Sequence, residues 1–345
     1  MKFYTDTSHY MDKRDWVNVP HVIRPFFVQE QIPLSALMSS IYTDSLAEAD
    51  YAVLPMNMEY YYTKGLEKQM HDFIDRVRKA GKPVVAINDG DYGIKYDLSD
   101  VIVLCQNGYQ SSRKPNEYAH AFIVDDPLPL FFGLTDIRVR DKGKKPVIGF
   151  DGLAGQSLAK TTYHILNNIK HNILSILGIS IFATNRLIPG TVYREKALRL
   201  IEADSRIKAN FNKRTKFRAG ARNADEQKSL SLEFYSNMMD SDYILCCRGG
   251  GNFSKRIYET LAMGRIPVFI NTDCILPLDN IIDWKKYCIW VEKDDIKHIC
   301  DKIVEFHNNL SNEEFRALQI SCRTMWESHL TEYGELISLH SLVKK

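Results

Sequence analysis

The chain has 345 residues, of which 45% are hydrophobic and 26% are charged, and its formal net charge is +2. This composition is that of an ordinary globular protein, long enough for two domains that each bury their own core. The small net charge argues against a dedicated nucleic-acid-binding protein, which would be far more basic.

The sequence also indicates in which cellular compartment the protein is expected. No stretch approaches the roughly 18 apolar residues of a membrane-spanning helix, and residues 1–6 lack the apolar core of a signal peptide. The seven cysteines show neither a disulfide framework nor the spacing of a zinc site. We therefore expect a cytoplasmic protein with reduced thiols.

Strand-like and helix-like segments alternate in the first part of the chain. Short apolar runs at 52–54, 84–87 and 101–104 predict buried strands, and the pattern at 64–80 predicts an amphipathic helix. This alternation is typical of a parallel sheet covered by helices on both faces. The basic, proline-containing stretch 138–146 is the predicted domain boundary.

A second alternating series begins at residue 147. The predicted strands are 147–150, 207–211, 243–246, 266–270 and 288–291. The predicted helices are 194–203, 254–263, 297–308 and 313–329. The sequence thus predicts an N-terminal domain over 1–143 and a C-terminal domain over 144–345, each with an α/β sheet.

A glycine-rich loop joins the predicted strand 243–246 to the predicted helix 254–263. Three consecutive glycines, 249–251, let the backbone approach an anion closely, and the following helix presents a positive N-terminus. Arg248 and Arg256 flank the loop with charges suited to a diphosphate, and the Glu259 carboxylate can accept hydrogen bonds from a ribose. The pattern indicates a nucleotide diphosphate site.

A purely structural interpretation of this loop is also open. It can be a tight connection in which Asn252 or Ser254 caps the helix, while Arg256 and Glu259 form a surface ion pair. The loop matches neither the dinucleotide fingerprint nor the P-loop, so neither a dehydrogenase nor a P-loop ATPase is supported.

The longer segment 243–291 resembles the C-terminal part of the exostosin family of glycosyltransferases. The residues that carry the resemblance are Cys247, Gly249 to Gly251, Ser254, Arg256, Glu259, Gly264, Ile266-Pro267-Val268, Leu276-Pro277 and Ile282-Asp283-Trp284. Weaker similarity covers 48–55 and 88–93. Arg248 departs from the apolar residue or proline that many animal members carry there, so its contacts with the donor can differ.

The resemblance implies a GT-B architecture, in which two doubly wound Rossmann-like domains face a cleft. It also implies an inverting glycosyltransferase, here a soluble bacterial-type member that moves a sugar from a nucleotide diphosphate, with UDP expected, to a glycan or a lipid-linked acceptor. The predicted donor-binding residues are Arg248, Gly249, Gly250, Gly251, Asn252, Ser254, Arg256 and Glu259.

Two carboxylates of the N-terminal half, Asp89 and Asp91, form an Asp-x-Asp motif directly after a predicted strand. Three interpretations are open: a turn, a divalent-metal site, or a catalytic base on the acceptor side. We expect Asp91 to be the base, with Asp89 as the second candidate. No obligatory cofactor or metal is expected, because the arginines and the glycine loop already supply positive potential.

Two other functions remain open, a nucleotide-sugar epimerase of the same fold and a non-catalytic glycan-binding or nucleotide-sugar-binding protein. The expected partners are the nucleotide sugar and the acceptor, with no nucleic acid. The basic span 206–222 is either a solvated face or a contact for diphosphate or anionic lipid, which would place the protein peripherally at a membrane. The insert 152–190 has no counterpart in the family.

Overall fold

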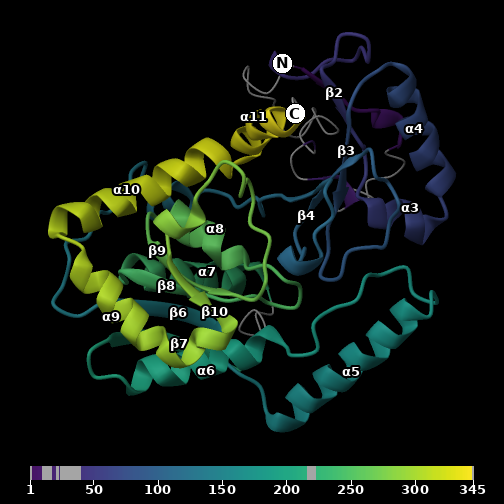
Figure 1. The fold of residues 1–345 in the computed structure, drawn as a ribbon. Coiled ribbons are helices and arrows are strands. Elements are labelled where there is room, and N and C mark those ends of the chain that lie inside the picture. Colours follow the sequence, from purple (N-terminus) through teal and green to yellow (C-terminus); the bar gives the residue numbers. More distant parts are fainter. Residues whose placement is uncertain (1, 10–17, 21–22, 24–39, 216–222, 344–345) are drawn as a thin grey trace.

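The computed structural model describes residues 2–9, 18–20, 23, 40–215 and 223–343. It contains two five-stranded parallel sheets, one in each half of the chain (Figure 1). Both sheets are flanked by helices, so the predicted two-domain α/β architecture is confirmed.

The first sheet has its strands side by side in chain order. They are β1 (Phe3–Tyr4), β2 (Tyr51–Val53), β3 (Val84–Asn88), β4 (Ile102–Cys105) and β5 (Glu117–Ala119). The middle strands are continuous apolar runs because parallel strands are buried on both faces.

Helices α3 (Met58–Lys64) and α4 (Glu67–Lys79) connect β2 to β3. In α4, Met70, Phe73, Ile74 and Val77 recur at helical spacing and are buried against the sheet. The helix is followed by Gly81, whose φ of +69° favours glycine.

The second sheet has the order β10-β9-β8-β6-β7. Its strands are β6 (Val147–Leu153), β7 (Lys208–Arg214), β8 (Tyr243–Cys246), β9 (Ile266–Asn271) and β10 (Ile289–Glu292). After β7 the chain returns to the other side of β6, so the strand order reverses between β6 and β8. Ligands of doubly wound sheets bind at the carboxyl ends of the strands at such a reversal.

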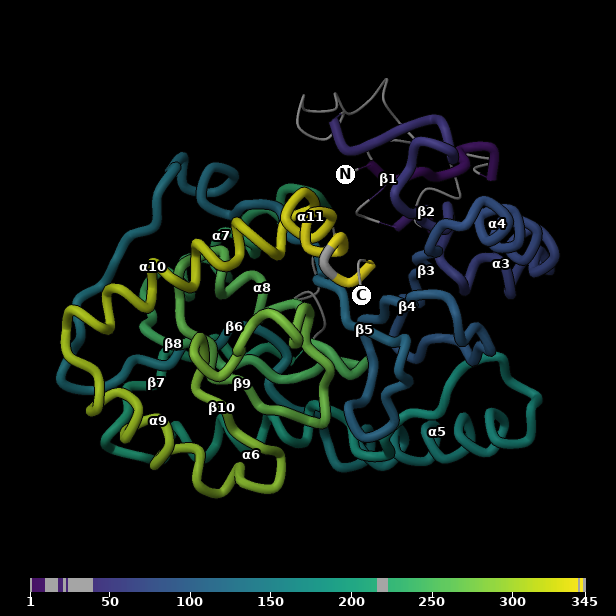
Figure 2. Tube along the Cα trace, turned by 45° about the horizontal axis from the view of Figure 1, so that its top comes forward, coloured from purple at the N-terminus to yellow at the C-terminus, as the bar shows by residue number. Residues whose placement is uncertain are grey.

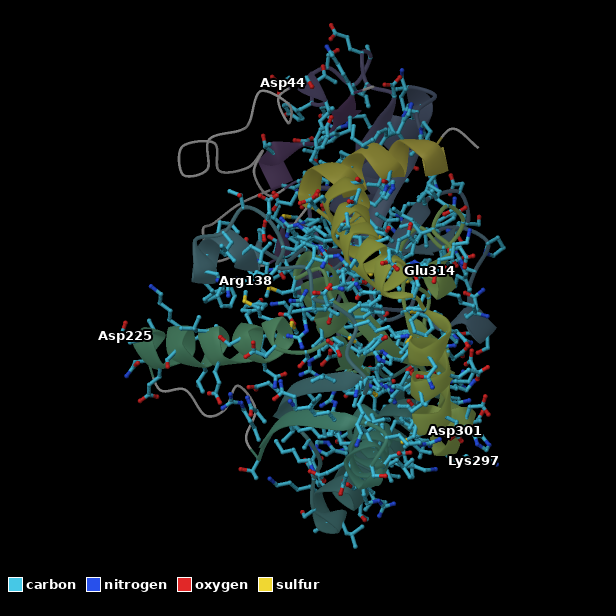
Figure 3. The ribbon with its side chains drawn as sticks, turned by 90° about the vertical axis from the view of Figure 1, so that its left-hand side faces the viewer. Asp44, Arg138, Asp225, Lys297, Asp301 and Glu314 are labelled. Carbon is cyan, nitrogen blue, oxygen red and sulfur yellow. The ribbon has the colours of Figure 1, made fainter. Side chains whose placement is uncertain are left out.

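The remaining helices belong to the second half of the chain. They are α5 (Leu158–Ile176), α6 (Gly190–Ala203), α7 (Ala224–Met239), α8 (Lys255–Ala262), α9 (Ile299–Asn309), α10 (Asn312–His329) and α11 (Glu332–Val343). Short helical turns lie at Thr7–His9, Gln110–Ser112, Leu128–Phe132, Trp284–Lys286 and Lys293–His298. Helix α7 projects from the body with Asp225 near its outer end (Figure 3), and α5 lies at the edge of the molecule, away from both sheets (Figures 1 and 2).

The C-terminal helices lead back to the first domain (Figure 2). Helix α10 packs on α8 of the second domain, whereas Leu336, Leu339 and Leu342 of α11 are buried in the hydrophobic core of the first. The domain boundary at 143 stays a prediction, but the core of the first sheet includes this helix from the far end of the chain.

The contacts between the domains include polar ones beside the apolar packing of α11. The Asn252 side chain donates a 2.9 Å hydrogen bond to the carbonyl oxygen of Gly108 in the first domain. Arg113 forms an ion pair of 2.5 Å with Asp279. Two Rossmann-like domains joined in this way form the GT-B arrangement, and both loops predicted to carry function lie where the domains meet.

Candidate functional site

A cavity of about 680 Å³ lies at the carboxyl ends of β6 and β8, where the strand order reverses. Its walls come from the end of β6, the glycine loop after β8, and helices α5 to α8, with Tyr92 contributed by the first domain. A cavity at this point of a doubly wound sheet is the expected ligand site.

Six of the predicted donor-binding residues line this cavity, and they are Arg248, Gly249, Gly250, Ser254, Arg256 and Glu259. Asn252 and Gly251 do not. Asn252 is 1% exposed; its Nδ2 bonds across the domain boundary to the carbonyl oxygen of Gly108, and its Oδ1 accepts a 2.8 Å hydrogen bond from Thr272 of its own domain. The Gly251 amide donates to Asp91. The structure therefore brings six of these residues together and places the other two at the domain contact.

Arg256 is partly buried in the cavity wall although it carries a charge. Its Nη2 donates a 2.7 Å hydrogen bond to the backbone carbonyl of Asp151, and its guanidinium lies 4.3 Å from the centre of the Phe150 ring. Burial lowers the pKa of Arg256. Gly152 makes room for it, because a Cβ there would lie 2.9 Å from Nη2.

Two further buried arginines line the same cavity. Arg194 of α6 donates a 2.8 Å hydrogen bond to the carbonyl oxygen of Arg248, and burial lowers the pKa of Arg194 to about 10. The Arg248 guanidinium donates to the carbonyl oxygen of Ile188. Within the described ranges, the hydrogen bonds of these arginines go to backbone carbonyls and none has a carboxylate ion pair.

Arg214, also in the cavity wall, is different. Its guanidinium makes two hydrogen bonds to the buried Asp151 carboxylate, of 2.6 and 2.8 Å, and lies 3.0 Å from Glu233. Its charge is thus neutralised by protein carboxylates. The cavity consequently combines one neutralised arginine with three that lack an anionic partner in the described chain.

Glu259 is 7% exposed and faces the cavity from the second turn of α8. Its Oε1 lies 3.4 Å from the Lys255 ammonium and 3.5 Å from the Tyr235 hydroxyl. The carboxylate is therefore held at the cavity wall, oriented by two neighbours and able to accept hydrogen bonds from a ligand.

Asp91 contacts the glycine loop directly. Its Oδ1 accepts a 3.1 Å hydrogen bond from the Gly251 amide, and a Cβ at Gly250 would lie 2.6 Å from its Oδ2. Its neighbour Tyr92 lines the cavity. The carboxylate thus lies between Tyr92 and Gly250, two residues that line the cavity, and accepts a hydrogen bond from one of the amides expected to bind an anion.

Asp89 has a different set of contacts. It accepts a hydrogen bond from Nε2 of the buried His120, whose Nδ1 lies 3.6 Å from Glu335 of α11. Burial alone would lower the pKa of His120, but the charges and hydrogen bonds of Asp89 and Glu335 outweigh burial and raise that pKa to about 10. The imidazole is therefore protonated at neutral pH, and Asp89 belongs to a charge cluster that ties β3, β5 and α11 together.

In the predicted basic span 206–222, several described side chains form ion pairs with carboxylates. Arg206 pairs with Asp204 and Asp301, and Lys213 pairs with Glu202. Residues 216–222 of this span lie outside the described residues. In the described part of the chain, no group of three His, Cys, Asp or Glu side chains could hold a metal, and no helix is long and apolar enough to cross a bilayer.

Sequence reasoning missed Arg194, Asp151 and Tyr235. Asp151 follows the apolar start of β6, and a polar residue at the carboxyl end of a buried strand is a signal that could have been used. Arg194 and His120 carry no local signal, because their roles depend on contacts with residues 31 to 215 positions away.

Comparison with known proteins agrees with this geometry. Residues 181–305 match the model of the exostosin GT47 domain. The chain is 37% identical over 71 residues to a protein of Physcomitrium patens named Probable glucuronosyltransferase 47 A, a segment that is 21% of this chain and 16% of that protein. It is 25% identical over 113 residues to Exostosin-1 of Drosophila melanogaster, covering 33% of this chain and 14% of that protein.

The chain thus spans about one sixth or less of the length of these curated relatives. The matched region contains part of the cavity wall, namely the glycine loop and α8, together with Arg194 and Arg214. Residues 181–305 of the chain are thus similar to the exostosin GT47 domain, and the curated proteins that match the chain carry the names of an exostosin and a glucuronosyltransferase.

Proposed function

We propose that the protein is a glycosyltransferase that takes its sugar from a nucleotide diphosphate, with UDP as the nucleotide, and passes it to a glycan or lipid-linked acceptor. The observation that carries the proposal is a set of three arginines around one cavity, the buried Arg194 and Arg248 and the partly buried Arg256, without carboxylate ion pairs in the described chain.

A buried guanidinium is costly unless an anion is paired with it. Here the backbone carbonyls satisfy some N–H groups, yet none of the three guanidinium groups forms an ion pair with a carboxylate of the described residues. A diphosphate supplies two negative charges and many acceptor oxygens, and bonds between arginine and phosphate are among the strong charge-assisted kind. As the sugar departs, the same groups stabilise the charge that develops on the leaving diphosphate.

Asp91 is the proposed base. In an inverting transfer, a carboxylate takes the proton of the attacking hydroxyl while the diphosphate leaves from the opposite side of the sugar. In the structure Asp91 accepts a hydrogen bond from the Gly251 amide. Binding of the diphosphate at the glycine loop would replace Asp91 there by charge repulsion and free its carboxylate for the acceptor. Product analysis tests the reaction, because transfer requires an acceptor and epimerisation does not.

Replacing Glu259 by alanine should weaken UDP binding by about 1.5–3 kcal/mol, the scale of a hydrogen bond to a charged group. Isothermal titration calorimetry with UDP measures this loss. Glu305→Ala is the matched control, since Glu305 is an exposed glutamate on α9, away from the cavity. If wild type, Glu259→Ala and Glu305→Ala bound UDP with equal affinity and kept their fold, Glu259 would not be a contact of the ribose.

The diphosphate is proposed to be held by protein groups without an obligatory metal. Asp89 and Asp91 face different partners, His120 and Gly251, whereas the arginines already surround the cavity. Sugar transfer should therefore persist after dialysis against EDTA. Loss of transfer, with recovery only on adding manganese or magnesium, would instead make the two aspartates metal ligands.

A further inference from the structure

Helix α5 turns its polar side inward. Asn172 exchanges two hydrogen bonds with the backbone of Asn185, of 2.7 and 2.8 Å. Ser175 Oγ donates a 2.7 Å hydrogen bond to the carbonyl oxygen of Phe182. These bonds attach the helix to the extended segment that follows it and fix its rotation about its own axis.

The opposite face of α5 is apolar and exposed to solvent. Its residues, which we call the α5 stripe, are Leu158, Tyr163, Leu166, Ile169, Ile173, Ile176 and Leu177, with Leu177 forming the C-cap. Their exposed fractions range from 37% for Ile169 to 87% for Leu158. A helix that packs on a core shows the reverse arrangement, so the α5 stripe needs a partner outside this chain.

The charge around the α5 stripe points to an anionic partner. Residues 152–186 include Lys160, Lys170 and Arg186 but no aspartate or glutamate, and Arg186 forms an ion pair with Asp273. Lys160 and Lys170 are exposed on α5 itself. Lysines beside an apolar stripe suit a bilayer surface, where the stem follows the apolar region and the ammonium reaches the lipid phosphates.

A cavity of about 550 Å³ adjoins the stripe at Ile176. Tyr92 and Asn185 line both this cavity and the one that holds the buried arginines. The stripe is thus continuous with the candidate site through a pair of neighbouring cavities. A second copy of the chain fits the stripe less well, because pairing α5 helices would bring lysines together without a carboxylate in the segment.

We propose that α5 is an interfacial helix that docks the protein on an anionic lipid bilayer, with the α5 stripe among the acyl chains. The segment lies largely outside the matched exostosin domain, which begins at residue 181. The role of docking rests on the proposed function. Docking presents the head group of a lipid-linked acceptor to the second cavity, while the lipid chain of that acceptor stays in the bilayer.

Sedimentation with vesicles tests this docking. The full chain should bind vesicles of equimolar phosphatidylcholine and phosphatidylglycerol, bind pure phosphatidylcholine weakly, and be released by salt. The double variant Leu166→Ser, Ile173→Ser should bind the anionic vesicles about 100-fold less, because two buried aliphatic side chains are lost from the bilayer. Lys160→Glu, Lys170→Glu should reduce anionic-vesicle binding without touching any apolar residue.

The matched control is Ile281→Ser, Ile320→Ser, two isoleucines of similar exposure, 48% and 51%, that lie outside α5. It should bind vesicles like the wild type. Absence of wild-type binding, or unchanged binding of the Leu166/Ile173 variant, would overturn the proposal. The proposal would also be overturned if the Leu166→Ser, Ile173→Ser variant changed from dimer to monomer in light scattering while it still bound vesicles. UDP calorimetry on the same variants should show unchanged affinity, and failure of UDP to bind the wild type would count against the proposed function alone.

Discussion

Arg256→Met is expected to weaken UDP binding by roughly 100-fold or more while changing the free energy of unfolding by only about 1 kcal/mol. Loss of two charge-assisted hydrogen bonds to a diphosphate corresponds to about 3 kcal/mol. The same substitution also removes a cation whose pKa is lowered by burial, which means that the charge is costly to the fold. The substitution removes the hydrogen bonds of Arg256 to the carbonyls of Asp151 and Leu245. This loss of stability is largely offset, because methionine has no charge that must be desolvated on folding.

Arg214→Met provides the control, because both arginines line the same cavity. Arg214 is neutralised by Asp151 and Glu233, so its removal should leave the Asp151 carboxylate buried and unpaired. Breaking a buried pair in this way costs about 3–5 kcal/mol of stability. We therefore expect Arg214→Met to unfold at a lower urea concentration than the wild type. Its folded fraction should bind UDP more tightly than Arg256→Met does.

Calorimetry and urea unfolding on both variants distinguish an arginine that binds the ligand from one that supports the fold. If Arg256→Met bound UDP as tightly as the wild type, the buried guanidinium would be structural. The diphosphate would then have to bind through the glycine loop and Arg194 alone.

The architecture was predictable because its signal is local. Buried parallel strands are short apolar runs, and the predicted strand at 243–246 coincides with β8. The predicted helices at 194–203 and 313–329 match α6 and α10 to within a few residues. The glycine loop was recognisable for the same reason, since consecutive glycines between a strand and a helix are visible without tertiary information.

Features that depend on distant contacts were not predictable. The three leucines of α11 have the spacing of any amphipathic helix, and nothing local shows that they pack in the first domain. The apolar residues of α5 likewise read as a core-facing pattern, and only the hydrogen bonds of Asn172 and Ser175 reveal that they face outward. Asn252 has the residue type of a ligand contact, but its amide is used between the domains.

Asp91→Asn is expected to lower the rate of sugar transfer by about 10²–10⁴-fold, the scale for loss of a general base. UDP affinity should stay equal to that of the wild type or become tighter, since an amide beside Gly251 no longer repels the diphosphate. Initial rates with saturating donor, combined with calorimetry, measure the two quantities separately.

Asp89→Asn is the informative comparison, because Asp89 and Asp91 share one loop but not one environment. Asp89 pairs with the protonated His120, so its replacement should lower the free energy of unfolding by about 3–5 kcal/mol. The folded fraction should still transfer sugar faster than Asp91→Asn. Near-normal rates in both variants would remove the loop from the chemistry. A rate loss confined to Asp89→Asn, with unchanged stability, would assign the base to Asp89.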